Sequence, residues 1–170
     1  MTATRMTADD RLDIFDLFAR YAWAYDCSDA QAYAETFAPD GVLAGVGQYR
    51  VEGRPAIQEA IQKFFEMRGE SLWQHHNDHL RIEGNSEECT VWSYWAVLEH
   101  RKLDDYHGVG RLGYYFSHCV KCDGRWCFKE RTFFVDMTEG LPWKRLRQAP
   151  KIAAATTVMD DPENNRTGIA

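Results

Sequence analysis

The chain has 170 residues, and its 20 Lys and Arg against 26 Asp and Glu give a formal charge of −6 at pH 7. That length suits one domain, and the acidic balance argues against a nucleic-acid partner, which usually calls for a basic face. Hydrophobic residues make up 45% of the chain, but no apolar run approaches the roughly 20 residues of a membrane-spanning helix. We therefore expect no membrane partner and, since the N-terminus lacks the apolar stretch of a signal peptide, a cytoplasmic protein.

The aromatic residues and the cysteines lead to two further expectations, one about a core or pocket and one about disulfides and metal. Aromatic residues make up 14% of the chain, with six Trp, so that rings either fill a large core or line an apolar pocket. An odd count of five cysteines indicates reduced thiols rather than a disulfide framework. Cys119 and Cys122 have the spacing of half a zinc site, but a second pair is missing, and a hairpin turning at Asp123-Gly124 is the simpler interpretation. We predict no metal and no cofactor.

Three segments in the N-terminal part of the chain have the spacing and end signals of α-helices. Thr7 and Asp10 resemble the ends of a capping box, although Asp replaces the usual Glu. Apolar residues then recur at helical spacing up to Tyr25, and Asp29 can cap another helix. Pro55 suits the first turn of a third helix. The expected helices run from Thr7 to about Asp26, from Ala30 to Phe37, and from Gly53 to about Gly69.

Beyond Gly69 the apolar period changes to two, which is typical of strands. Two short strands, Val42–Val46 and one around Tyr49–Val51, precede the third helix. Four long strands follow, and we expect them to pair as an antiparallel meander: Leu72–Glu83, Cys89–Leu103, Val109–Lys121 and Trp126–Met137. Helices followed by a curved sheet predict an α+β fold, a cone-shaped antiparallel sheet packed on three N-terminal helices and enclosing a pocket.

The last part of the chain differs in composition. We expect a single domain over residues 1–140 and a C-terminal tail over residues 141–170. Trp143 and Leu146 can fold back over the mouth of the cavity as a partial lid. The polar end, Met159 to Ala170, is predicted to be disordered.

Asp26 is the first candidate for chemistry. It stands at the C-terminal end of an apolar helix, where the helix dipole disfavours a carboxylate, and its neighbour Tyr25 belongs to the apolar face. Either Asp26 points inward for a functional reason, or it is a turn residue in the segment before Asp29.

Gln74–His79 contains three histidines within five positions. In a strand, His75 and His79 share one face, whereas His76 and Asp78 share the other. An inward His beside a carboxylate forms a dyad, because the carboxylate fixes the tautomer and supports the imidazolium that forms when the His takes a proton. The alternatives are a metal site, which lacks an obvious third ligand, and a polar strand face in solvent.

His100 and Arg131 are further candidates on the long strands. His100 shares its strand face with Tyr94 and Leu98, and the alternative is a strand-end His in solvent. Arg131 shares a face with apolar Phe133, and an inward Arg needs an anion such as a substrate oxyanion. The alternative for Arg131 is a salt bridge at the rim of the sheet.

Several segments, in this order and spacing, carry a family pattern: Arg20–Asp26 followed by Asp29, Phe37–Gly41, Gly53–Ile57, Gln74-His75 and Asp123–Trp126. From about Leu12 to Val135 the chain therefore resembles the SnoaL-like branch of the nuclear transport factor two-like superfamily. The resemblance implies the same α+β cone. Enzymes of that superfamily include scytalone dehydratase, bile acid dehydratase, lindane dehydrochlorinase, ketosteroid isomerases and polyketide cyclases, and it also has non-catalytic members.

Within the superfamily the chain is most similar to scytalone dehydratase. A Tyr-Asp pair closes the first helix of that enzyme, and Tyr25 and Asp26 match it. A Gln-His pair begins a strand after the third helix, and Gln74 and His75 match it. His100 falls at the interval of a second His, which ends the next long strand. The resemblance therefore implies Asp26, His75, Tyr25 and His100 as catalytic residues.

The pocket of the chain departs from that enzyme. A pocket tyrosine of the dehydratase falls near Gly45, with Tyr49 as a nearby substitute, and a pocket Asn falls near Tyr115. Scytalone itself is therefore not the expected substrate. Arg131 resembles an arginine on the last strand of the dehydrochlorinase. The candidate substrate-binding residues are Tyr49, Tyr115, Arg131 and Trp73, and Tyr94 and Trp143 are further aromatic candidates around the cavity.

The resemblance implies a cofactor-independent lyase. His75, oriented by Asp26, would remove a proton from a small apolar aromatic or polycyclic substrate, with loss of water or a small aldehyde. Tyr25, with His100 or Arg131, would stabilise the developing oxyanion. The alternatives are an isomerase or cyclase of the same superfamily, and a non-catalytic module like the β-subunit of ring-hydroxylating dioxygenases. We also expect a homodimer or homotrimer that covers the open face of the sheet.

Overall fold

Helices precede the long strands in the computed structural model, which describes residues 4–45 and 49–135. The helices are α1 (Ala8–Asp26), α2 (Ala30–Glu35) and α3 (Arg54–Arg68). The strands are β1 (Phe37–Ala44), β2 (Arg50–Glu52), β3 (Leu72–Gly84), β4 (Glu88–Arg101), β5 (Tyr106–Cys122) and β6 (Arg125–Val135). The predicted order of elements is confirmed, and most boundaries agree within three residues.

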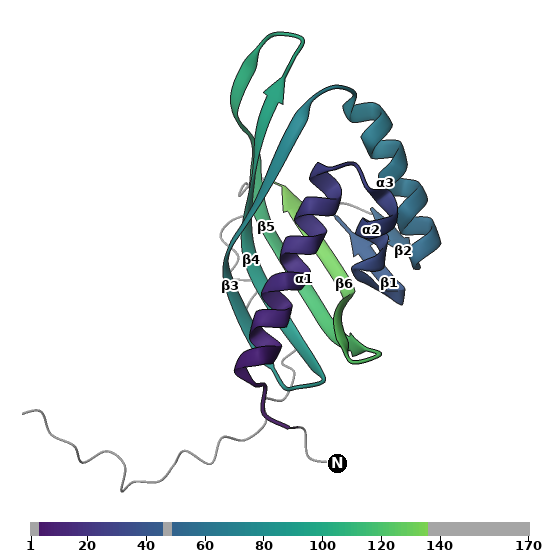
Figure 1. Cartoon of the computed structure of the whole chain (residues 1–170), viewed down its shortest axis with the longest axis vertical. Helices are drawn as coiled ribbons and strands as arrows, with labels where there is room; N and C mark the ends of the chain where they lie inside the picture. The colour runs from purple at the N-terminus through teal and green to yellow at the C-terminus, as the bar shows by residue number, and fades with distance from the viewer. Residues whose placement is uncertain (1–3, 46–48, 136–170) are drawn as a thin grey trace, which may run out of the picture.

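Six strands form one curled sheet in the order β2-β1-β6-β5-β4-β3. Strands β3 to β6 make the antiparallel meander that the sequence predicts. Strand β1 runs parallel to β6, a pairing that the sequence analysis did not anticipate. Figure 1 shows α1 lying across one face of the sheet, with α2 and α3 beside β1 and β2. The α+β fold with a curved sheet on three helices is confirmed.

The capping box predicted for α1 is present and also anchors the helix to the sheet. The Thr7 hydroxyl accepts from the N–H of Asp10, and the Asp10 carboxylate accepts from the N–H of Thr7. The same buried carboxylate pairs with Lys121 at 2.7 Å and accepts from the indole N–H of Trp126 at 3.3 Å. Burial alone would raise the pKa of Asp10, but these hydrogen bonds outweigh it and hold the pKa well below its usual range.

The first strand begins earlier than the sequence predicts. The second helix ends at Glu35 rather than Phe37, and β1 starts at Phe37 rather than Val42. A register shift between Phe37 and Val42 accommodates the Pro-Asp-Gly segment as a bulge, where a missing ladder hydrogen bond is tolerated. Gly41 belongs there because a Cβ would lie 2.8 Å from the carbonyl oxygen of Phe128.

The core lies between α1 and the sheet. Ile14 and Leu17 are fully buried, and Phe18 packs edge-on against Phe128 with ring centroids 5.2 Å apart. Burying each such side chain stabilises the fold by about 2 kcal/mol.

The five cysteines are free thiols, as predicted. The predicted hairpin turn between β5 and β6 has the positive φ angles of a two-residue turn, 52° and 78°, at Asp123-Gly124.

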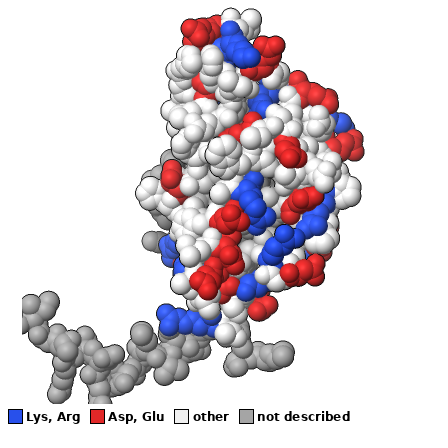
Figure 2. Space-filling model, in the orientation of Figure 1, with Lys and Arg blue, Asp and Glu red and all other residues white. Residues whose placement is uncertain are grey.

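In the part of the chain that the structure describes, no helix is long and apolar enough to cross a bilayer. On the face seen in Figure 2, acidic and basic side chains intermingle, and no continuous basic patch appears. The predicted tail over residues 141–170, including the lid at Trp143, lies outside the described residues.

Candidate active site

Two side chains 49 positions apart in the sequence meet at the end of α1. Asp26, the last residue of α1, places Oδ1 at 2.5 Å from Nδ1 of His75 on β3. The backbone N–H of His75 also donates to Oδ2 of Asp26, at 2.8 Å. The Asp26 and His75 side chains are 16% and 7% exposed, so water reaches them little. The structure thus brings Asp26 and His75 together as a largely buried carboxylate–imidazole pair.

An arginine from α3 helps to fix this end of α1. Arg68 donates from Nη1 to the carbonyl oxygen of Tyr25 at 3.2 Å and from Nη2 to the hydroxyl of Ser28. Carbonyl groups in the last turn of a helix lack partners within the helix and carry the negative end of its dipole, so a cation there is stabilising. The Asp26 carboxylate, which the dipole disfavours, is held by the two His75 contacts instead.

A cavity of about 460 Å³ opens beside the pair. It lies between the helices and the curled sheet, and aromatic side chains supply much of its wall. Its volume falls within the usual range of sites for small molecules. The lining residues are Tyr21, Tyr25, Tyr33, Leu43, Tyr49, Ile61, Phe64, Met67, Arg68, Ser71, Trp73, His75, Trp95, Val97, Glu99, Arg111, Tyr115, Phe133 and Val135.

Tyr25 and Trp73 form an aromatic wall next to the histidine. Their rings stack with centroids 5.9 Å apart and planes at 11°, and the Tyr25 ring lies 4.7 Å from that of His75. The guanidinium groups of Arg68 and Arg111 lie 5.6 and 5.2 Å from the Trp73 ring. Burial raises the pKa of Tyr25 to about 12, so its phenol stays protonated at neutral pH.

Several polar groups of the cavity lining are buried without a hydrogen-bond partner in the described structure. They are the hydroxyl of Tyr49, the indole N–H groups of Trp73 and Trp95, and Nε of Arg68. Indole and guanidinium nitrogens only donate, and a buried donor without an acceptor costs about 1–3 kcal/mol. A ligand that presents acceptor oxygens would satisfy these groups.

Three tyrosines lie together on another part of the wall. The hydroxyl of Tyr33 donates to that of Tyr21 at 2.7 Å, and the Tyr21 ring packs edge-on against Tyr115 with centroids 6.0 Å apart. Burial raises the pKa values of Tyr33 and Tyr115 well above the usual range. These phenols are therefore neutral hydrogen-bonding groups rather than anions.

Arg131 packs against the ring of Tyr115 but does not itself line the cavity. Its guanidinium carbon sits 3.7 Å from the Tyr115 ring centroid and 4.5 Å from that of Phe18. It is fully buried and donates to the Ser117 hydroxyl at 2.9 Å and to the Asn77 side chain at 3.2 Å. Arg131 forms no salt bridge at the rim of the sheet with any described residue, and aromatic faces stabilise the cation instead. The expected contact of Arg131 with substrate stays a prediction.

His100 and Tyr94 lie on the opposite face of β4 from the cavity. Side chains alternate along a strand, and the residues of β4 that line the cavity are Trp95, Val97 and Glu99. His100 instead stacks on His107 with ring centroids 3.9 Å apart, and Tyr94 packs against His79. The structure therefore does not bring His100 to Asp26 and His75. Tyr25, Tyr49, Trp73 and Tyr115 do line the cavity.

Sequence reasoning missed several charged residues of the lining. Strict alternation of side chains along the strand from Trp95 would have placed Glu99 in the cavity. The interval of the family pattern instead favoured His100 as the site residue. Arg68 and Arg111 gave no sequence signal, because an Arg near the end of a helix or on a strand is usually in solvent. A tyrosine at Gly45 would have to displace the Phe133 ring, since a Cβ there would lie 2.3 Å from that ring.

Metal-ligating side chains gather in one place among the described residues. His100, Asp105 and His107 place their ligand atoms within 4.8 Å of one another, outside the cavity. The cysteines of β5 and β6 form no such group in the described part of the chain. The cavity lining therefore offers acid–base and hydrogen-bonding groups rather than a metal-ligand set.

Comparisons with known proteins agree with this fold. A family model, the SnoaL-like domain, matches residues 6–132. A search of curated proteins returned no match.

Many solved structures are similar to the chain. A protein from Catenulispora acidiphila, solved in complex with S-DNPA, is 26% identical with a TM-score of 0.68, over 84% of this chain and 100% of that chain. ActVI-ORFA from Streptomyces coelicolor is 20% identical with a TM-score of 0.66, over 75% of this chain and 98% of that chain. A candidate scytalone dehydratase from Novosphingobium aromaticivorans is 23% identical with a TM-score of 0.65, over 77% of this chain and 89% of that chain. The last two likenesses show the fold alone.

Proposed function

Because the chain belongs to the SnoaL-like domain family, we propose that it is a cofactor-independent lyase of the dehydratase type. Its substrate is a small aromatic or polycyclic molecule, which loses water or a small aldehyde. The observation that carries this proposal is the 2.5 Å contact between Nδ1 of His75 and Oδ1 of Asp26 beside the aromatic cavity.

His75 acts as the base in this reaction. When Asp26 accepts a hydrogen bond from Nδ1–H, the other ring nitrogen, Nε2, keeps a lone pair that can take a proton. The proton leaves a carbon next to a substrate carbonyl, and the electron pair of the broken C–H bond moves into that carbonyl as an enolate. The Asp26 carboxylate then stabilises the imidazolium. The enolate expels the hydroxyl on the neighbouring carbon, which takes the proton from Nε2 and departs as water. For loss of an aldehyde, Nε2 instead takes the proton of that hydroxyl, the bond between the two carbons breaks to leave the enolate, and the imidazolium returns the proton to the enolate carbon.

The developing oxyanion needs donors, and the cavity has them. Tyr25 lies against His75 and stays protonated, since burial raises its pKa to about 12. The Tyr49 hydroxyl and the Trp73 indole N–H are buried and lack partners. Fixed donors of this kind stabilise a transition-state oxyanion without reorganisation at the moment of reaction. Tyr25 is the donor in contact with the base, so we assign it this role.

The lining also indicates the class of substrate. A cavity of about 460 Å³ holds two or three fused rings with substituents. Stacked rings such as Tyr25 and Trp73 favour a flat aromatic ligand. The unpaired donors of Tyr49, Trp73 and Trp95 favour ring oxygens that accept hydrogen bonds. We therefore expect an aromatic substrate with carbonyl or hydroxyl groups on more than one edge.

The carboxylate–imidazole pair favours an enzyme over a non-catalytic module. A subunit that only assembles with a partner needs no buried base beside a cavity. Isomerisation and cyclisation begin with the same proton abstraction, and the mass of the product separates them from elimination. Loss of one water or of one aldehyde identifies the lyase, whereas an unchanged mass identifies an isomerase or a cyclase.

The experiment is a screen of hydroxylated aromatic and polycyclic ketones with the full chain, followed by variants at the base. His75→Ala should lower kcat/KM by about 10³-fold, the usual contribution of a general base. His76→Ala is the matched control, because this neighbouring side chain is exposed on the other face of β3. Turnover that survives in a folded His75→Ala protein would remove His75 from the reaction.

Oligomeric state is a separate part of the proposal. A curled, open sheet leaves one broad face to be covered, which is a common reason for association. We propose a homodimer or homotrimer, and light scattering of the full chain measures which of them forms. A monomer at micromolar concentration would contradict this part and leave the proposed reaction untouched.

A further inference from the structure

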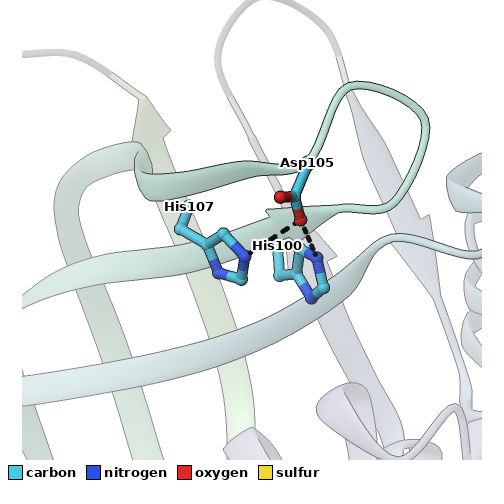
Figure 3. A group of neighbouring side chains, drawn as sticks. All are labelled: His100, Asp105 and His107. Atoms are coloured by element: carbon cyan, nitrogen blue, oxygen red, sulfur yellow. Dashed lines mark ion pairs between the residues drawn. The ribbon is translucent and has the colours of Figure 1, made fainter.

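The hairpin between β4 and β5 carries a second group of polar side chains. His100 near the end of β4 and His107 near the start of β5 are directly opposite each other in the strand pairing. Their rings stack with centroids 3.9 Å apart and planes at 17°. Figure 3 shows the two imidazoles side by side, with Asp105 reaching toward both of them from the connecting loop.

One carboxylate oxygen serves both rings. Oδ1 of Asp105 lies 3.4 Å from Nε2 of His100 and 3.4 Å from Nε2 of His107. Asp105 has a positive φ of 51°, a left-handed conformation that Asp tolerates better than most residues. The tight turn thus directs the carboxylate back over the two strands, and two nitrogens and one oxygen converge on a single region.

A neighbouring cation does not compete for this carboxylate. Arg101 pairs with Asp104 through Nε and Nη2, at 3.2 and 2.8 Å, and lies over the Tyr106 ring. Among the described residues, Asp105 has ion pairs with the two histidines and with no Lys or Arg. Its negative charge therefore remains available to a cation that the two imidazoles can also bind.

We propose that His100, Asp105 and His107 bind one first-row divalent transition metal ion, for which Zn²⁺ is the expected occupant. Two imidazole nitrogens and a carboxylate oxygen are the donors that Zn²⁺ takes at about 2.0–2.2 Å. The three ligand atoms already lie within 4.8 Å of one another, so small side-chain rotations close the site. Hard cations such as Mg²⁺ prefer oxygen donors and should bind far more weakly.

The location of the site defines its role. Strand alternation puts Glu99 in the cavity and His100 on the outer face, so the ion does not touch the substrate. It would instead tie β4 to β5 where their hairpin extends past the rest of the sheet, as Figure 1 shows. The side chains there are exposed, Asp105 by 89% and His107 by 64%, so the hairpin has little packing of its own. The ion would therefore stabilise the hairpin locally rather than take part in the reaction.

The test is a calorimetric titration of Zn²⁺ into the full chain without a histidine tag. We expect one ion per chain, and His100→Gln and His107→Gln should each weaken binding by roughly 100-fold or more. His76→Gln, an exposed histidine outside the group, is the matched control and should change the affinity less than about 2-fold. Zn²⁺ should also slow amide hydrogen exchange at the β4–β5 hairpin, and Mg²⁺ at the same concentration should not.

Each alternative outcome is distinct. Absence of Zn²⁺ binding by the wild-type chain would overturn the proposal. Unchanged binding by both His100→Gln and His107→Gln would also overturn it, and would assign the ion to other residues such as the free cysteines. Since all three side chains point outward from the sheet, a circular dichroism spectrum equal to that of the wild type would show that the variants are folded.

Discussion

Carboxylate and imidazole meet both at Asp26–His75 and at the β4–β5 hairpin, in very different surroundings. In the first pair the side chains are 16% and 7% exposed, and one ring nitrogen is fixed by the carboxylate. In the second group Asp105 and His107 are 89% and 64% exposed and His100 is 32% exposed, with both Nε2 atoms directed at the same oxygen. Burial beside a cavity favours proton transfer, whereas converging exposed donors favour a cation. The same residue types thus acquire different chemistry from their positions.

Removing the charge of Asp26 in the buried pair should have the largest effect on turnover. Asp26→Asn keeps the shape of the side chain but removes the charge that supports the imidazolium, so kcat should fall by about 10³-fold. Steady-state kinetics on the substrate found by screening measures this loss. The zinc stoichiometry at the hairpin should stay at one ion per chain. A kcat within a few-fold of the wild type would mean that His75 needs no charged partner.

A third carboxylate, Asp10, sharpens the contrast because it is buried but has no imidazole partner. Asp10→Ala should lower the free energy of unfolding by about 2 kcal/mol, since it removes the carboxylate that accepts from the N–H of Thr7 in the capping box and leaves Lys121 without its partner. Urea denaturation measures this change. Turnover of the protein that remains folded should not change.

The pH dependence of the free energy of unfolding provides a second test of Asp10. The pKa of Asp10 is lower in the folded than in the unfolded chain, so the unfolded chain binds more protons in acid. The stabilisation is complete above the unfolded pKa of about 4 and is lost as the pH falls toward the folded value. Asp10→Asn should therefore flatten the acid limb of stability against pH. An acid limb equal to that of the wild type would contradict the lowered pKa.

The smallest expected effect concerns the oxyanion. Tyr25→Phe keeps the ring that packs on His75 and Trp73 but removes the hydroxyl, so kcat should fall about 10-fold with little change in KM. A larger change in KM than in kcat would show that the hydroxyl binds the ground state. Phe64→Leu, at a partly exposed position of the cavity rim, controls for loss of packing and should affect KM more than kcat.

Local sequence patterns predicted the order of helices and strands, and they singled out Asp26 and His75. Helix caps, the change from helical to strand period and the Asp-Gly turn led to the observed order of elements. Asp26 and His75 were recognisable because a carboxylate at a helix C-terminus and a histidine on an alternating strand are both unusual without a reason. The family resemblance then joined residues that neither periodicity nor spacing could join.

Features that depend on distant partners were not predictable. The parallel pairing of β1 with β6 joins segments from opposite ends of the fold and has no local pattern. The environment of Arg131, buried among the rings of Phe18 and Tyr115, depends on α1 packing against β5 and β6. His100 was placed by a family interval, but strand alternation decides the face, and it turned Glu99 inward instead.

A double-mutant cycle on Asp26 and His75 tests the proposed base most directly. If Asp26 acts only through His75, then adding Asp26→Asn to His75→Ala should lower kcat/KM by no more than about 3-fold beyond the His75→Ala value. Full additivity, with the double variant losing the product of the two single effects, would contradict a carboxylate–imidazole pair that works as one unit.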